Sequence, residues 1–547
     1  MRVVHALSLL LLFCLVAPPA PAADTTTVPL FDGLGAHTRT VSTRSPEAQR
    51  YFDQGMAFLY AFNHDEAIRS FTRAAELDPD CAMAHWGVAV ANGPHINNTV
   101  VPPERAAAAW AALARARASS AGATAVERAL IEALAARYAE PQPEDRSALD
   151  RGYAEAMRRV WQAHPHDADV GALFAEALAD LRPWDLWTPA GQAQPGTGEL
   201  IATLDAVIAL DADHPLANHL YIHAVEASPE PGRADAAADR LRFLQPGLGH
   251  MVHMPSHIDV RQGRWQQAIE ANARAIAADR RYTARSPEQQ FYRLYMAHNH
   301  HMLAYAAMMN GQSRLALATM REMVADIPPP FFRANPWADG MMAMPLEVMM
   351  RFGMWEQILA EPDFPDYVPF SRALRHYARA VALAATGDLD GARREETAFR
   401  VARAGVPAAT TFGNNTAADL LDVAERLMGG ELRYRAGETD AGLAMLADAV
   451  AHEDRLRYDE PPGWIQPVRH PYGAALLQAG RIAQAEAVFR EDQRRQPGNG
   501  WGLYGLMRAL ELQGRQAEAD AVEQEFDRVW ANADTRIKSP CLCLPGV

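Results

Sequence analysis

Residues 51–79 of the 547-residue chain read YFDQGMAFLYAFNHDEAIRSFTRAAELDP, and the spacing within this stretch decides the fold. Small, aromatic and proline residues follow Gly55 at intervals of 12, 16, 19 and 24 positions, namely Ala67, Phe71, Ala74 and Pro79. Small residues at such intervals let two antiparallel helices pack closely, and a proline ends the second helix before the next unit begins. The stretch therefore predicts a tight helical hairpin.

A second stretch repeats this spacing near the other end of the chain, with Gly473, Ala485, Phe489 and Pro497 at the same positions relative to one another. Both stretches resemble the tetratricopeptide repeat (TPR), and weaker copies of the pattern lie between them. The resemblance implies an all-α fold, a TPR-like α-solenoid in which antiparallel helix pairs form a superhelical array with long inserted loops.

We predict four parts of the chain: a signal peptide at 1–22, an extended segment at 23–46, a solenoid of about nine repeats at 47–530 and a C-terminal tail at 531–547. Three aromatic loops interrupt the repeats, at 183–198, 327–337 and 458–464. Long loops in a compact array either cover and fill a groove or only plug gaps between degenerate repeats. Both interpretations remain open.

The N-terminus has the features of a secretory signal peptide. Arg2 supplies a positive charge, residues 3–16 form an apolar run, and Ala20-Pro21-Ala22 matches a cleavage signal. We therefore expect an exported protein, periplasmic or secreted. No later stretch is long and apolar enough for a transmembrane helix, so the sequence predicts no membrane span.

The overall charge argues against a nucleic-acid partner. The chain has 52 basic and 67 acidic side chains and a formal net charge of −15. Nucleic-acid binding needs a concentrated basic surface that neutralises phosphates, and no such run occurs here. The sequence also contains no P-loop, G-x-S-x-G or H-E-x-x-H motif, which excludes the commonest nucleotide-binding and hydrolase signatures.

Histidines concentrate in the middle of the chain, where nine of the 19 lie between His214 and His301. In TPR proteins the first helix of each pair lines the concave groove, and the turn glycines set the phase of that helix. Seven of the nine histidines fall at groove-facing positions. They form three stripes, each on one helical face: His219 and His223; His250, His253 and His257; His298 and His301.

These stripes predict a transition-metal site. Packed helices lie about 8–10 Å apart, so imidazoles from neighbouring helices can converge on one ion, and imidazole is the commonest transition-metal ligand. Zinc, copper and iron are all compatible with the pattern, as one ion or two. Two other interpretations stay open: a polar groove that binds an anionic or peptidic ligand, and ordinary core histidines.

Four further residues are candidates for catalysis. Glu226 would complete the ligand shell of a metal or act as a base, and Glu347 is a second carboxylate at a groove-facing position. Arg469 would clamp a carboxylate or phosphate of a substrate, and His470 lies beside it. For the carboxylates, the alternative is a solvated groove wall.

Three cysteines remain beyond the signal peptide, Cys81, Cys541 and Cys543, which is too few for a disulfide scaffold. The pair in Cys541-Leu542-Cys543 is either a soft-metal ligand pair or a disulfide. The sequence leaves the state of all three cysteines open.

The whole chain resembles a group of exported bacterial TPR proteins, through the segments 62–67, 253–258, 298–300 and 459–462. This resemblance implies fold and export, and no activity is carried over from it. Two functions therefore compete. One is a solenoid with a histidine-rich metal site in its groove, with or without catalysis on a small molecule or peptide. The other is a non-catalytic scaffold that binds an exported protein or peptide.

Overall fold

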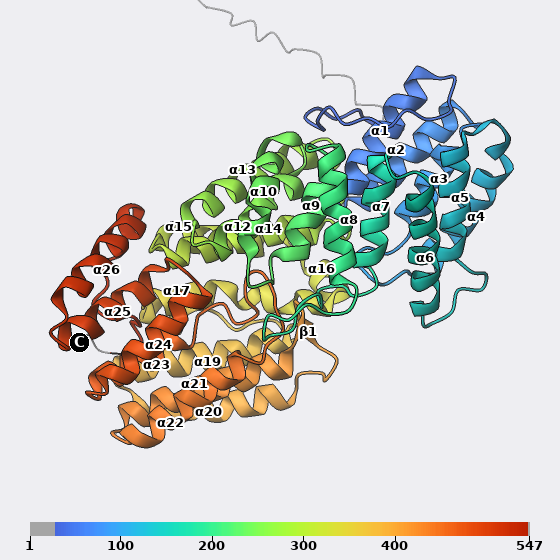
Figure 1. Ribbon diagram of the computed structural model, residues 1–547. Coiled ribbons are helices and arrows are strands. Elements are labelled where there is room, and N and C mark those ends of the chain that lie inside the picture. The colour runs from blue at the N-terminus through green and yellow to red at the C-terminus, as the bar shows by residue number, and fades with distance from the viewer. Residues whose placement is uncertain (1–27, 545–547) are drawn as a thin grey trace, which may run out of the picture.

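The computed structural model describes residues 28–544, so the predicted signal peptide lies outside the described residues. Helices form nearly all the regular structure of this range, and most helices pack mainly against a neighbour along the chain. Figure 1 shows these helices as an elongated array that runs from the N-terminal part in blue to the C-terminal part in red. The predicted all-α, TPR-like solenoid is confirmed.

The helices of the N-terminal part are α1 (Pro46–Tyr60), α2 (His64–Leu77), α3 (Ala82–Ala91), α4 (Pro103–Ala118), α5 (Ala125–Leu134), α6 (Ser147–Ala163), α7 (Ala168–Ala179), α8 (Thr197–Leu210) and α9 (Pro215–Val225). Those of the middle are α10 (Asp235–Leu244), α11 (Gly249–His253), α12 (Pro255–Arg261), α13 (Trp265–Thr283), α14 (Arg293–Met309), α15 (Ser313–Asp326), α16 (Pro329–Ala334), α17 (Met344–Arg351) and α18 (Trp355–Ala360).

The helices of the C-terminal part are α19 (Pro369–Thr386), α20 (Leu389–Ala404), α21 (Ala417–Arg435), α22 (Thr439–Glu453), α23 (Arg469–Gln478), α24 (Ile482–Arg495), α25 (Gly500–Leu512) and α26 (Gln516–Val529). A short antiparallel pair, β1 (Thr411–Phe412) and β2 (Asn415–Thr416), precedes α21.

The spacing that defines the repeat has a direct packing cause. Phe71 on α2 is fully buried and lies against two glycines, Gly55 on α1 and Gly87 on α3. A Cβ atom at Gly55 would lie 2.5 Å from the Phe71 ring, which is closer than packed atoms approach. Phe489 occupies the equivalent position between Gly473 and Gly505. At these two places one aromatic ring therefore joins a hairpin to the helix that follows it.

The buried apolar side chains form two large cores. One extends from Val41 to Tyr295 and the other from Val260 to Leu544, so the two overlap in sequence over α12, α13 and part of α14. Of the four helices that carry the histidine stripes, α9 and α11 contribute only to the first core, whereas α12 and α14 contribute to both.

Both ends of the described chain fold back on the array. Near the N-terminus, the Gly247 amide donates to the Gly33 carbonyl at 2.8 Å, and α1 contacts α9. Near the C-terminus, Asp534 accepts hydrogen bonds of 2.7 Å from the amide and hydroxyl of Ser313 at the start of α15. These returns enclose the middle of the solenoid.

The inserted loops also turn inward. The Trp187 indole donates to the Ala224 carbonyl of α9 at 2.8 Å, and the Trp184 indole donates to the Asn97 side chain at 2.9 Å. The predicted loop at 327–337 contains the short helix α16, with Phe332 buried. All three aromatic loops thus place large side chains within the array.

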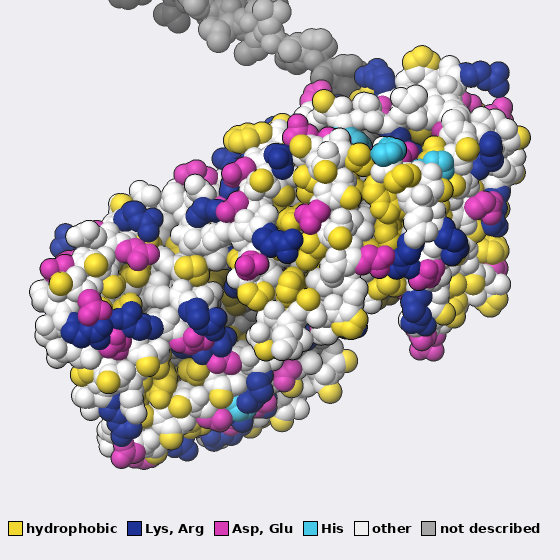
Figure 2. All heavy atoms as spheres, in the orientation of Figure 1, with side chains coloured by type: hydrophobic (Ala, Val, Ile, Leu, Met, Phe, Trp, Pro, Cys, Tyr) yellow, Lys and Arg dark blue, Asp and Glu magenta, His cyan; other side chains and the backbone are white. Residues whose placement is uncertain are grey.

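The described surface mixes both signs of charge. On the face drawn in Figure 2, Lys and Arg side chains are interspersed with Asp and Glu, and no continuous basic surface is visible there. Among residues 28–544, none of the helices combines the length and the apolar character that crossing a membrane requires.

Candidate metal centre

Six of the predicted histidines come together in the interior. His219 and His223 project from α9, His250 and His253 from α11, His257 from α12 and His298 from α14, and neighbouring ring centroids are 4.6–5.9 Å apart. All except His298, which is half-buried, are at most 7% exposed. The sequence placed these residues in an open groove, whereas the structure encloses them.

A kinked helix carries the central stripe. Pro255 has no amide hydrogen, so α11 ends and α12 begins at this point, but Met254 keeps helical angles (φ −49°, ψ −39°). The backbone therefore continues in a helical direction through the proline. As a result, His250, His253 and His257 project from two consecutive helical segments toward one region.

Four of these imidazoles form a hydrogen bond between Nδ1 and an oxygen atom. The four pairs are His219 with the Tyr60 carbonyl (2.8 Å), His223 with Glu226 Oε1 (2.9 Å), His253 with Asn272 Oδ1 (2.6 Å) and His257 with Glu226 Oε2 (2.5 Å).

These partners determine which ring nitrogen carries the proton. A backbone carbonyl and a carboxylate can only accept hydrogen bonds. Asn272 Oδ1 also acts as an acceptor, because the amide nitrogen of this side chain already donates a hydrogen bond to the Ala268 carbonyl at 2.8 Å. Each of the four Nδ1 atoms is therefore the donor. In a neutral imidazole the lone pair then lies on Nε2, which is the form that ligates metals.

Ring nitrogens of the six imidazoles converge in two groups. The first, group A, consists of His219, His223 and His250. The second, group B, consists of His253, His257 and His298. Within each group, one ligating nitrogen from each residue lies within 4.8 Å of the other two.

The closest approaches within the groups join Nε2 atoms. His219 Nε2 and His250 Nε2 are 3.1 Å apart in group A, and His253 Nε2 and His257 Nε2 are 2.7 Å apart in group B. Each contact is short enough for a hydrogen bond when one of the two nitrogens carries a proton, and a metal ion bound by both nitrogens would take the place of that proton. His223 Nε2 is buried and has no hydrogen-bond partner in the described structure. An orphaned buried nitrogen of this kind is what a missing water or ion leaves behind.

The electrostatics favour neutral imidazoles. Burial, reinforced by the neighbouring histidines, lowers the pKa of His219, His250 and His298 well below the usual value of 6.5. Burial alone would raise the pKa of Glu226, but His257 and His223 lower it to about 2. His257 is the exception, because burial lowers its pKa less than the carboxylates of Glu226 and Glu460 raise it.

Glu226 thus lies at the cluster, but both of its carboxylate oxygens accept hydrogen bonds from imidazoles, one from each group. Its geometry is that of an orienting carboxylate that fixes the rings of two imidazoles. Glu460, from the loop at 458–464, adds a second carboxyl, with Oε2 3.3 Å from His257 Nδ1.

A small cavity adjoins group A. Its volume is about 20 Å³, and its lining includes His223, Glu226, Trp184 and Tyr458. A cavity of this size holds about one water molecule. Trp184 and Tyr458 come from two different inserted loops, so these loops line the space next to His223.

Several residues of the site carry no clear signal in the repeat pattern. The positive φ of Phe62 (57°) brings its ring to 4.5 Å from the His219 ring and 5.7 Å from the His250 ring. Asn272 and the Tyr60 carbonyl are equally unmarked. Phe62 and Glu460 do lie in the segments 62–67 and 459–462 that the family resemblance singled out, but their distance along the chain from the histidines hid their positions beside the imidazole rings.

The other predicted site residues have different surroundings. His301 lies one turn beyond His298, 6.0 Å from the Phe412 ring, with its Nε2 unpartnered. The Glu347 carboxyl accepts a 2.7 Å hydrogen bond from Gln466. None of these contacts reaches group A or group B.

Arg469 and His470 belong to a separate polar network. Arg469 donates two hydrogen bonds to the Asp454 carboxylate, at 2.8 and 2.7 Å. His470 accepts from Arg351 at Nδ1 (2.7 Å) and lies 3.1 Å from Asp492 at Nε2. Arg469 is paired with Asp454, and His470 with Arg351 and Asp492. The structure does not bring either side chain to the histidine groups.

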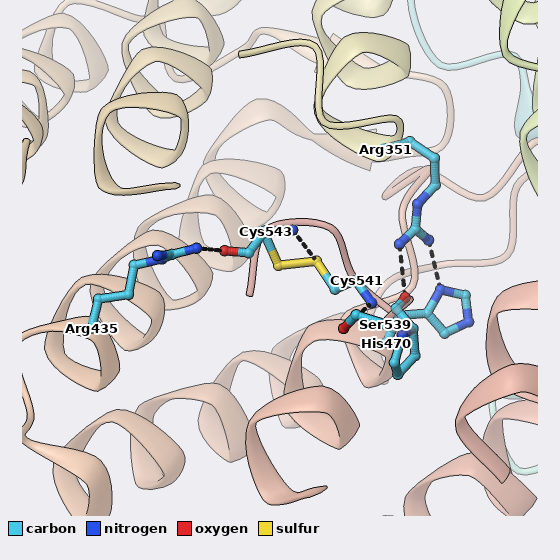
Figure 3. Close-up of a disulfide and its surroundings, with 7 residues drawn as sticks. Arg351, Arg435, His470, Ser539, Cys541 and Cys543 are labelled. Carbon is cyan, nitrogen blue, oxygen red and sulfur yellow. Dashed lines mark hydrogen bonds between the residues drawn. A yellow bond between two sulfur atoms is a disulfide. The ribbon is translucent and has the colours of Figure 1, made fainter. Parts of the chain in front are cut away.

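The cysteine pair forms a disulfide that anchors the tail. Cys541 is bonded to Cys543, while Cys81 is buried with a free thiol. Figure 3 shows Arg435 pointing at the Cys543 carbonyl and Arg351 reaching the segment before Cys541, where it donates to Pro540. With their sulfur atoms joined, these cysteines do not ligate a metal in this state.

His37 and His214 form a further cluster around Asp169, in which hydrogen bonds engage both ring nitrogens of His214. His214 Nδ1 accepts from the Ala217 amide at 3.2 Å, so Nε2 carries the proton that bonds to Asp169 at 3.1 Å. Asp169 also accepts from His37 at 2.9 Å and from Tyr60 at 2.5 Å. This network joins the N-terminal segment to α7 and α9, and His214 has no lone pair left for a metal.

No protein-family model and no curated protein sequence matches this chain. Solved structures with similarity to it include a human IFIT1 dimer with m7Gppp-AAAA (12% identity, 90% of this chain and 91% of that chain, TM-score 0.33). Others are the APC/C hetero-tetramer Cut9-Hcn1 (11%, 91% and 79%, TM-score 0.32) and yeast Tom70 (12%, 89% and 92%, TM-score 0.28).

Proposed function

We propose that the protein is an exported TPR-like solenoid that binds a transition-metal ion through its buried histidine cluster. The observation that carries the proposal is the arrangement of four imidazoles whose Nδ1 atoms are fixed by oxygen acceptors, so that their Nε2 lone pairs point into one region. Metal-ligating histidines show this second layer of hydrogen bonds because it sets the tautomer and ring direction of each ligand.

The chemistry of the donors limits the choice of metal. Imidazole nitrogen suits zinc, copper and iron, whereas magnesium and calcium prefer oxygen donors. Three protein ligands beside a water-sized cavity is also the pattern of a catalytic site, which keeps one coordination position open. A metal bound next to His223 would lower the pKa of a water held there, and the cavity restricts an unaltered site to very small substrates.

Export is part of this proposal and is supported by the positive, apolar and A-x-A segments of the N-terminus. The test is N-terminal sequencing of protein made with its full leader in a bacterial host. A mature N-terminus near residue 23 in the periplasmic or secreted fraction is expected. An unprocessed N-terminus in the cytoplasm would refute export.

The metal proposal is tested by elemental analysis of the untagged full chain beside a His253→Ala/His257→Ala variant. We expect at least one equivalent of zinc, copper or iron in the wild type and a clear loss in the variant. A His376→Ala variant is the matched control, because His376 bonds to Glu395 far along the chain and is expected to keep the full content. Metal at background level in the wild type, also after reconstitution, would overturn the proposal.

The alternative function, a non-catalytic scaffold for an exported protein or peptide, is favoured by a different feature. An open hollow of about 1240 Å³ lies between α4, α6 and the loop at 183–198. Its lining combines Val100, which is 71% exposed, with Pro141, Pro143 and Leu181. Peptide binding there would weaken after Val100→Glu and Leu181→Glu substitutions, and metal content would not change.

A further inference from the structure

The six imidazoles are arranged as two equal sets. Groups A and B each contribute three ring nitrogens within 4.8 Å of one another. The groups adjoin, since the His223 and His257 rings are 5.6 Å apart and the His250 and His253 rings are 5.9 Å apart. Six nitrogens exceed the four positions of one tetrahedral ion, and three per ion would leave one position open on each.

The distances within group A fit a single ion. Two imidazole nitrogens bound to one tetrahedral zinc at about 2.0–2.1 Å lie roughly 3.3–3.4 Å apart. The separation of His219 Nε2 and His250 Nε2 is 3.1 Å, so only a small adjustment is needed. In group B the 2.7 Å separation of His253 Nε2 and His257 Nε2 must widen further to fit one ion.

One carboxylate joins the two groups. Glu226 accepts from His223 of group A through Oε1 and from His257 of group B through Oε2. The two rings therefore direct their Nε2 atoms away from the same carboxylate, each into its own group. A single side chain thus fixes one ligand of each set.

We propose that this protein holds two metal ions, one in group A and one in group B, and that Glu226 orients a ligand of both. This inference rests on the proposed metal-binding function and deepens it. It assigns a stoichiometry and a shared positioning residue to the site, and it makes the two ions neighbours within one enclosed space.

The first test is stoichiometry. Full-length protein freed of metal by a chelator is titrated with Co²⁺, whose visible absorption reports imidazole coordination, and loading is verified by elemental analysis. We expect two equivalents in the wild type and in the His376→Ala control. A His219→Ala/His250→Ala variant and a His253→Ala/His298→Ala variant should each bind one.

The outcomes separate this inference from the proposed function. Absence of binding in the wild type would overturn both. One equivalent in the wild type, lost in both double variants, would leave the metal-binding function standing and overturn the two-ion arrangement.

A second measurement needs no variant at all. Two Cu²⁺ ions in adjacent sites broaden or suppress each other's electron paramagnetic resonance signals, so the fully loaded wild type should show weaker signals than two isolated Cu²⁺ centres. Two unperturbed signals, with no sign of interaction between the ions, would contradict neighbouring sites.

The role of Glu226 is tested by two substitutions. Glu226→Ala removes both acceptors and is expected to weaken both sites by about 10- to 100-fold, as loss of second-layer partners usually does. Glu226→Gln can accept at one end only, so one site should weaken by that factor while the other keeps its affinity. Equal affinity of both sites in wild type and Glu226→Ala would show that the carboxylate does not position the ligands.

Discussion

At the scale of single residues, the direction of one amide decides what His253 can do. The amide nitrogen of Asn272 donates a hydrogen bond to the Ala268 carbonyl within α13. The side-chain oxygen of Asn272 therefore faces His253. Asparagine in a helix interior has low helix propensity, because its side chain competes for backbone hydrogen bonds. Here the lower helix propensity of asparagine is combined with a hydrogen-bond acceptor for His253 Nδ1. The lone pair of His253 therefore stays on Nε2, which faces the other imidazoles.

Replacing this amide gives a direct prediction. Asn272→Leu leaves His253 Nδ1 without an acceptor, and we expect metal affinity at the cluster to fall about 10- to 100-fold. Asn272→Asp retains an acceptor oxygen at the same position and should stay within a few-fold of the wild type. Competition with a chelating dye measures both, and an equal loss in the two variants would indicate a packing role instead.

Glu347 illustrates a buried carboxyl outside the cluster. Burial raises its pKa from 4.5 to about 7, against a lowering contribution from the Gln466 hydrogen bond. The folded chain therefore keeps this proton at pH values where the unfolded chain has lost it. The stabilising contribution is complete below pH 4.5 and declines as the pH rises from about 4.5 to 7.

The Glu347→Gln variant should lack this decline. Compared with the variant, the wild type is expected to lose up to about 3 kcal/mol of unfolding free energy between pH 4 and pH 8, at about 1.4 kcal/mol per pH unit. Urea unfolding at a series of pH values measures the difference. Parallel curves for the two proteins would show that Glu347 ionises normally in the folded state.

At the scale of helices, the contact of Phe71 with two glycines explains why the repeat could be predicted from spacing. The interval between Gly55 and Phe71 is fixed because the Phe71 ring packs against the Gly55 backbone, and both residues lie within a single hairpin. The histidine stripes were predictable for the same reason, because three- and four-residue spacings place side chains on one helical face. Local periodicity therefore grouped these histidines by helical face, and the structure brings six of them together.

What local periodicity could not supply are contacts between distant hairpins. Phe62 and Tyr60 reach His219 from a turn about 160 positions earlier, and Glu460 reaches His257 from a loop about 200 positions later. These contacts depend on how the array curves back on itself. The same curvature buries residues that the repeat phase placed in an open groove, and it leaves Arg469 and His470 in a different network.

The hairpin contact can be tested with alanine substitutions at two glycines. Gly87→Ala places a methyl group against the Phe71 ring and should destabilise the fold by about 1–3 kcal/mol. Gly198→Ala, in the first turn of α8 with no atom within 4 Å of the new methyl group, should be neutral or stabilising by up to about 1 kcal/mol. Chemical unfolding compares the two. Equal effects would contradict the packing argument.

At the scale of the whole molecule, the cluster lies where two hydrophobic cores meet. His219 and His223 stand on α9 of the first core, and His298 stands on α14, which belongs to both. An ion bound by residues from these helices would add a further link between parts of the chain that already meet through apolar packing and through the hydrogen bonds of Glu226. Metal binding should therefore stabilise the junction between the cores.

Removal of metal is thus expected to lower the thermal stability of the full chain. A ligand that binds only the folded state adds about 2.7 kcal/mol when its free concentration is 100 times its Kd. Differential scanning calorimetry with and without a chelator measures the change, and the His253→Ala/His257→Ala variant should be insensitive to it. A chelator effect of equal size in that variant would place the stabilising ion elsewhere.

The residues of the site are spread widely along the chain, and this spread limits when the site can form during synthesis and folding. Parts that touch the imidazoles come from Tyr60 at one extreme and Glu460 at the other. A ribosome must have made more than four-fifths of the chain before these parts can meet, and a chain threaded through a membrane in unfolded form carries no finished pocket across. The proposed ion would therefore be acquired where the chain folds, and the metal supply of that compartment, as much as the preference of imidazole, would decide which element the site binds.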